Sequence, residues 1–120
     1  MLPDVSFTAV SFDANDPAGL AGFWAALVGG SVQVDDDGDA FVRGAAAPPL
    51  DFLRVSEEKS AKNRIHLDLT VPDVAAAVAV AVGLGATAAP DVYSGERWVV
   101  LRDPEGNEFC LLPPDIPQPP

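Results

Sequence analysis

The chain has 120 residues, of which 48% are hydrophobic and 21% are charged, so it is long and apolar enough to fold as one domain and is not a disordered chain. A formal net charge of −11 argues against nucleic acid as a partner, because such binding depends on Lys and Arg neutralising phosphates. The single cysteine, Cys110, excludes an internal disulfide and a cysteine-rich zinc site.

The first predicted elements are a strand over Phe7 to Phe12 and a helix that begins after Asp16. Asp16 is a favoured helix cap, and Pro17 suits the first helical position. Apolar side chains recur at helical spacing and form one core-facing stripe: Leu20, Phe23, Trp24 and Leu27. The glycine pair at positions 29 and 30 is expected to end the helix.

Three short strands are predicted next, in the runs "SVQV", "AFVR" and "PLDFLRV". Asp37 and Gly38 are expected to take the positive backbone angles of a hairpin turn between the first two. The acidic run "VDDDGD" lacks the later bidentate glutamate of a calcium loop, and we therefore expect a solvated hairpin tip.

After the polar loop "SEEKSAKN", the order of elements begins again at "RIHLDLTVPD", at an offset of 57 residues. Asp73 matches Asp16 as a helix cap, and Glu108-Phe109 matches Asp51-Phe52 at the start of the last strand. The run "VAAAVAVAVGLG" is predicted as the second helix, and "ERWVVL" and "NEFCLL" as a hairpin around "RDPEGN". Each half is therefore strand, helix and three strands.

This repeat predicts an α+β fold of two βαβββ modules, about residues 5–56 and 63–113, within a single domain over residues 1–113. The proline-rich residues 114–120 are expected to be a tail. We expect the modules to form a curved mixed sheet around a shared cavity, with the helices on the outer face.

Several of these motifs together resemble a known family. The pair "FW" in the first helix, "GG" at its end, "KNRIHLDL" and "DPEGNEF" are similar to the glyoxalase-like proteins of the vicinal oxygen chelate superfamily, which includes bleomycin-resistance proteins and extradiol dioxygenases. The likeness covers about residues 5–113. It implies a divalent metal in the cavity, held by His, Glu or Gln side chains near the start of each first strand and in each last strand.

The four positions that the resemblance marks as metal ligands are Ala9, Leu53, His66 and Cys110. Alanine and leucine have no lone pair to donate, so we expect neither a metal nor another cofactor. A shifted site made of His66, Asp51 and Glu108 stays open, because both carboxylates precede a family position by two residues and share its strand face. Those two residues displace a ligand by about 6.6 Å, which disfavours convergence on one ion.

His66, the only histidine, lies in an alternating run in which Arg64, His66 and Asp68 share one strand face and Ile65, Leu67 and Leu69 the other. This row is either a set of satisfied hydrogen bonds or the polar part of a ligand pocket, and we favour the pocket. Cys110 is interpreted as a small buried hydrophobe rather than a nucleophile. The predicted ligand-binding residues are Ala9, Leu53, Arg64, His66, Asp68, Trp98 and Cys110.

Three functions are compatible with these residues. The first is a metal-free protein that binds a small organic ligand and sequesters a drug or metabolite; a cationic ligand would suit the acidic surface. The alternative is a lyase, isomerase or dioxygenase of the same superfamily, with His66 as general base and Arg64 orienting a carbonyl or carboxylate. The third is a structural or regulatory dimerising module.

The expected surroundings of the protein follow from the same sequence. The resemblance implies a homodimer. The longest weakly polar run, Val74 to Ala89, is shorter than a bilayer span, so no membrane partner is expected. The amino-terminal residues show no basic region followed by a long apolar stretch, which favours a cytoplasmic location.

Overall fold

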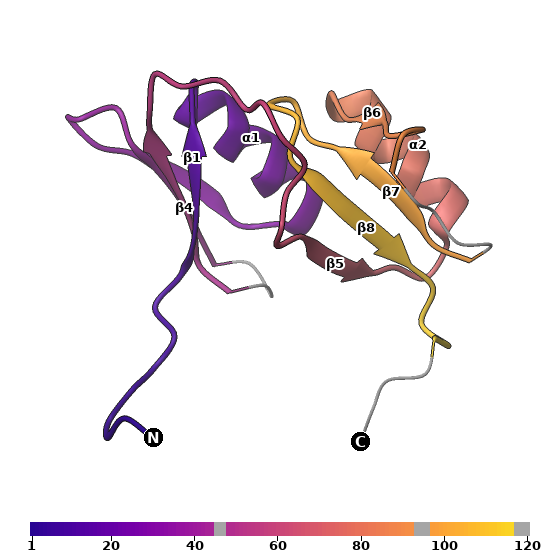
Figure 1. Cartoon of the computed structure of the whole chain (residues 1–120), viewed down its shortest axis with the longest axis horizontal. Coiled ribbons are helices and arrows are strands. Elements are labelled where there is room, and N and C mark those ends of the chain that lie inside the picture. Colours follow the sequence, from indigo (N-terminus) through magenta and orange to yellow (C-terminus); the bar gives the residue numbers. More distant parts are fainter. Residues whose placement is uncertain (45–47, 93–96, 117–120) are drawn as a thin grey trace. The chain divides into compact units, whose positions relative to one another are not determined.

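The chain folds into two compact units, Met1–Glu57 and Glu58–Pro120. The computed structural model describes residues 1–44, 48–92 and 97–116. Each unit is one βαβββ module, which confirms the predicted α+β class and the order of elements (Figure 1). The single domain over residues 1–113 and the shared cavity stay predictions, and residues 117–120 of the expected tail lie outside the described residues.

The first module contains one helix and a four-stranded sheet. Its elements are β1 (Val10–Ala14), α1 (Pro17–Val28), β2 (Ser31–Val34), β3 (Ala40–Arg43) and β4 (Leu50–Arg54). The strand order is β1-β4-β3-β2, with β1 parallel to β4 and the other pairs antiparallel. A parallel pair needs a long crossover connection, which α1 and the β2–β3 hairpin provide.

The helix α1 begins and packs as its sequence predicts. The Asp16 side chain accepts a hydrogen bond from the backbone N–H of Gly19 at 3.1 Å, which satisfies a donor that the first helical turn leaves unpaired. Of the predicted apolar stripe, Leu20, Phe23 and Trp24 are buried and Leu27 is half-buried. The core continues into the sheet through Phe12, whose ring lies 5.5 Å from that of Trp24 and 4.9 Å from that of Phe52.

Two local predictions for the first module are wrong. The first strand begins at Val10 rather than Phe7, because its partner β4 begins at Leu50, directly opposite Val10. In the β2–β3 turn, Gly38 has a positive φ of 84° and Asp37 does not. The Asp35 side chain explains this turn, since it accepts the backbone N–H groups of Asp37 and Asp39 and closes the loop locally.

The second module repeats the first. Its elements are β5 (Leu67–Thr70), α2 (Val74–Leu84), β6 (Thr87–Ala88), β7 (Val99–Arg102) and β8 (Glu108–Leu112). The strand order is β5-β8-β7-β6, again with the first strand parallel to the last. Figure 1 shows α2 lying along one face of this sheet. The face opposite α2 is therefore the one on which a site of this module can form.

The ends of α2 and the β7–β8 turn follow the sequence signals. Asp73 caps α2 by accepting the N–H of Ala76 at 3.1 Å, and Gly85 ends it with a left-handed φ of 119°. In the turn, the buried Asp103 accepts the N–H groups of Glu105 and Asn107. Within the described residues, neither helix reaches the length and hydropathy of a membrane span.

The predicted strand at "RIHLDL" is shorter in the structure. Pairing with β8 begins at Leu67, opposite Phe109, so residues 64–66 precede the ladder. The alternation expected from Ile65 onward is wrong at that residue, because Ile65 is 84% exposed instead of facing the helix. His66 therefore lies one residue before β5, where no ladder hydrogen bond fixes its backbone.

Candidate functional site

The candidate site lies on the sheet face of the second module opposite α2. Phe52, the counterpart of Phe109 in the first module, stacks on Phe12, which contacts Trp24 of α1. By this repeat and by the alternation of side chains along a strand, Phe109 and Leu111 of β8 are on the α2 side, whereas Glu108, Cys110 and Leu112 share the other face. The strand register places three more residues on this face. Asp68 of β5 pairs with Cys110. On β7, Val100 pairs with Cys110 and Arg102 pairs with Glu108. We call this surface, with the preceding residues His66 and Trp98, the His66 face.

Three of the predicted site residues meet at its centre. His66 Nδ1 lies 2.9 Å from Asp68 Oδ1 and 3.8 Å from Cys110 Sγ. Cys110 is buried at 7% exposure, whereas the side chains of His66 and Asp68 are 42% and 54% exposed. An ionised carboxylate can only accept, so Asp68 selects the imidazole tautomer with the proton on Nδ1 and the lone pair on Nε2.

The Cys110 thiol keeps its proton at neutral pH. Burial raises the pKa of the Cys110 thiol to about 11, and the hydrogen bond to Asp68 and the negative charge of Asp68 act in the same direction. Because a thiolate is the reactive form of cysteine, this environment makes Cys110 a poor nucleophile. Cys110 is a small buried side chain in the structure, and its thiol also donates a hydrogen bond to Asp68.

Apolar side chains surround this polar centre on one side. Cys110 forms a buried cluster with Ala89 and Val100, against which three half-buried residues pack: Val92, Trp98 and Leu112. Trp98 thus lies on the same face as the polar centre. An imidazole and a carboxylate beside an aromatic and aliphatic surface form the combination of groups that binds small organic molecules.

The other three predicted ligand-binding residues do not belong to the strands of the His66 face. Arg64 is exposed in the segment before β5. In the first module, Ala9 is half-buried just before β1, and Leu53 is 37% exposed in β4. The structure brings together His66, Asp68, Cys110 and Trp98 and keeps Arg64 outside their hydrogen bonds.

The implied four-ligand metal site does not fit these residues. Ala9 and Leu53 offer no donor atom, and Cys110 holds its proton. His66, Asp68 and Cys110 do place one ligand atom each within 4.8 Å of one another, which is three donors from the second module alone. Binding an ion there requires loss of the thiol proton, and it replaces the contacts that the three side chains already make.

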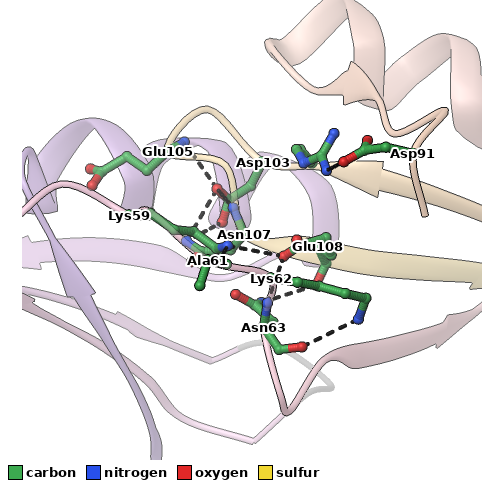
Figure 2. Close-up of polar contacts among 10 residues, drawn as sticks. Lys59, Ala61, Lys62, Asn63, Asp91, Asp103, Glu105, Asn107 and Glu108 are labelled. Carbon is green, nitrogen blue, oxygen red and sulfur yellow. Dashed lines mark hydrogen bonds and ion pairs between the residues drawn. The ribbon is translucent and has the colours of Figure 1, made fainter.

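Glu108, a candidate for the shifted metal site, belongs to a different group of contacts (Figure 2). Its buried carboxylate accepts the backbone N–H of Asn63 at 3.2 Å and lies 3.3 Å from Lys59 Nζ. The Asn63 side chain in turn hydrogen-bonds the backbone of Glu108. Glu108 therefore ties the loop before His66 to β8.

The pKa of Glu108 reflects these contacts. Burial by itself raises the pKa of the carboxyl, but the backbone N–H groups of Asn63 and Glu108 and the Lys59 ammonium outweigh it and hold the pKa below its usual range. Asp51, the other shifted candidate, pairs with Arg43 at 2.9 Å in the first module.

Sequence reasoning missed the charged residues at one end of the His66 face. A pocket of about 270 Å³ lies there, and three of the seven Lys and Arg residues of the chain line it: Lys59, Lys62 and Arg102. Strand alternation indicates Arg102, because it lies two residues after Val100, which pairs with Cys110, and therefore shares its face of β7. The two lysines lie in a loop that is held by contacts with Glu108. No local sequence pattern indicates the conformation of that loop.

Comparison with known proteins places this architecture in a family. The profile of the glyoxalase-like domain family matches residues 9–112. A search of curated protein sequences found no match.

Solved structures share the fold at low sequence identity. A glyoxalase/bleomycin resistance protein/dioxygenase family enzyme from Burkholderia phytofirmans PsJN has a TM-score of 0.71 at 19% identity, over 88% of this chain and 96% of that chain. A glyoxalase/bleomycin resistance protein from Albidiferax ferrireducens T118 has a TM-score of 0.63 at 24% identity, over 89% and 97%.

A mutant of a genomically encoded fosfomycin resistance protein from Listeria monocytogenes, in complex with Mn(II) and 1S,2S-dihydroxypropylphosphonic acid, has a TM-score of 0.72 at 12% identity, over 93% and 90%. At these identities, the likeness establishes the fold and leaves the chemistry to the site.

Proposed function

The chain belongs to the glyoxalase-like domain family, and on that premise we propose that it binds a small organic drug or metabolite without a metal, on the His66 face of its second module. One observation carries this proposal. The His66–Asp68–Cys110 group lies beside the apolar cluster that contains Trp98, so a ligand finds hydrogen-bonding groups and an aromatic surface together.

The polar and apolar parts have different tasks in this proposal. Asp68 fixes the His66 ring, and Nε2 is the atom that accepts a hydrogen bond from the ligand. Trp98, Val92 and Leu112 remove the apolar body of the ligand from water, which supplies most of the affinity.

Thermal unfolding with and without candidate ligands tests the proposal. A screen of small aromatic acids, 2-oxo acids and cationic compounds should contain ligands that raise the unfolding temperature, because a ligand at 100 times its Kd adds about 2.7 kcal/mol of stability. The same ligands should change Trp98 fluorescence in the wild type and lose affinity in His66→Ala. Val80→Ala, at an exposed position of α2, is the control and should bind as the wild type does.

A lyase or isomerase is the second candidate, and the 2.9 Å contact between His66 and Asp68 favours it. A general base needs a free lone pair and a group that orients the ring, and Asp68 provides that orientation. In this case Nε2 takes a proton from a carbon next to a carbonyl of the bound molecule. Exchange of that proton with deuterated water, seen by NMR for a ligand found in the screen, should be lost in His66→Ala; a ligand that binds without exchange supports sequestration.

A further inference from the structure

The His66 face changes in character along its length. On β8 it runs from Glu108 through Cys110 to Leu112. On the antiparallel β7, Arg102 lies opposite Glu108 and Val100 opposite Cys110, and Trp98 immediately precedes β7. The four-residue span of β8 corresponds to about 13 Å at the usual rise of a strand. One end of the face is therefore charged, the centre polar and the other end apolar.

Most charges at the charged end are already matched. Lys59 pairs with the buried Glu108 at 3.3 Å, and Arg102 pairs with Asp91 at 2.7 Å. These two ion pairs form walls of the 270 Å³ pocket, and each leaves little net charge for a ligand.

Lys62 differs from the other two cations of the pocket. Its ammonium group contacts a neutral acceptor, the carbonyl oxygen of Asn63 at 3.2 Å, and among the described residues no carboxylate pairs with it. In Figure 2 the Glu105 carboxylate points away from Lys62, at the opposite side of the group. The positive charge of Lys62 also reaches the centre of the face, since it lowers the pKa of the Cys110 thiol against the larger effects of burial and Asp68.

We infer that the ligand of the His66 face is an elongated amphiphilic carboxylate, whose anionic head binds Lys62 at the pocket and whose apolar body extends past Cys110 to Trp98. This inference rests on the proposed function and names its ligand class. The head exchanges a weak contact of Lys62 with a backbone carbonyl for a charge-assisted hydrogen bond. The apolar body covers the cluster of Val100, Trp98 and Leu112.

The net charge of −11 does not oppose such a ligand at this place. Exposed charges farther away than about 8 Å are largely screened at physiological ionic strength, so the charges around the pocket matter most. The pocket lining holds three cations and three carboxylates, and among the cations Lys62 is the one for which the described part of the chain shows no carboxylate partner. A cationic ligand, which the overall charge suggests, would instead place its charge beside Lys62 and is disfavoured here.

Three matched probes test the inference: 4-phenylbutyrate, 4-phenylbutyramide and 4-phenylbutylamine, which share one apolar body and differ in the charge of the head. Titration calorimetry with the full chain should show the carboxylate binding about tenfold or more tighter than the amide, as a charge-assisted hydrogen bond implies. The amine should bind more weakly still. Lys62→Met should bind the carboxylate and the amide equally while keeping the amide affinity of the wild type.

Arg54→Met is the control, because it removes one exposed positive charge from β4 of the first module. It should change the ratio of carboxylate to amide affinity by less than about twofold, the size expected of a screened surface charge. An amide that binds the wild type as tightly as the carboxylate, or an Arg54→Met variant that loses the preference as Lys62→Met does, overturns the assignment to Lys62 and leaves the proposed function standing. If none of the three probes binds, the inference fails, and the thermal-unfolding screen alone decides the proposed function.

Discussion

Asp68 links the polar groups of the His66 face, because both the His66 imidazole and the Cys110 thiol are hydrogen-bonded to it. Its hydrogen bond and its charge add to the effect of burial in raising the pKa of Cys110 to about 11. Removing the charge should therefore lower that pKa and raise the thiolate fraction at any pH below it.

Asp68→Asn should accordingly react faster with iodoacetamide at pH 8, by roughly threefold or more, since each pKa unit changes the thiolate fraction tenfold. Asp36→Asn, in the exposed β2–β3 turn, should react at the wild-type rate. Mass spectrometry of the alkylated protein against time gives the rates, and an Asp68→Asn rate equal to that of the wild type would show that Asp68 does not act on the thiol.

The ionised Glu108 carboxylate is expected to make the stability of the protein depend on pH. Its pKa is lowered in the folded protein, so the stability from its charge is fully present above the unfolded pKa of about 4.3 and is lost as the pH falls through the folded pKa. Glu108→Gln should lower the free energy of unfolding by about 1–3 kcal/mol at pH 7, with the difference from wild type shrinking below pH 4. Urea unfolding at several pH values measures it, and a pH-independent difference would assign the loss to packing rather than charge.

The sequence predicts the residues at the centre of the His66 face better than those around it. His66, Asp68 and Cys110 were marked by strand alternation and by the family positions, and the structure brings them into contact. Lys62 carries no comparable signal, because it lies in a loop held by the contact between Asn63 and Glu108, 45 residues apart in the chain. Such contacts depend on the completed fold and not on local pattern.

Among the elements, the helices were predicted closely and the first strands were not. The caps at Asp16 and Asp73 are local signals that lie within three residues of the groups they bind. The starts of β1 and β5 instead depend on where β4 and β8 begin, and these partners are about 40 residues away.

Two glycines of α1 test the capping account. A Cβ at Gly19 would lie 2.3 Å from Asp16 Oδ2, whereas a Cβ at Gly22 would meet nothing within 4 Å. Gly22→Ala should stabilise the protein by about 0.5–1 kcal/mol through helix propensity. Gly19→Ala should lack this gain because the new methyl group displaces the Asp16 cap. Thermal unfolding compares the two, and equal gains would mean that the cap contributes nothing.

For the whole molecule, a homodimer stays a prediction from the family resemblance. Two copies with a net charge of −11 each repel at low ionic strength, and salt screens that repulsion. Sedimentation equilibrium should therefore show a dimer that tightens between 20 and 300 mM NaCl, conditions that span Debye lengths of roughly 20 to 6 Å. A monomer at all salt concentrations would contradict it.

The proposed function requires that the His66 face bind its ligand by shape and hydrogen bonds, without an ion. The most direct test is the metal content of the protein purified without chelators and dialysed against metal-free buffer, measured by elemental mass spectrometry for zinc, nickel, iron and manganese. We expect far less than one ion per chain, with no difference between the wild type and His66→Ala. About one ion per chain in the wild type that is lost in His66→Ala would contradict it.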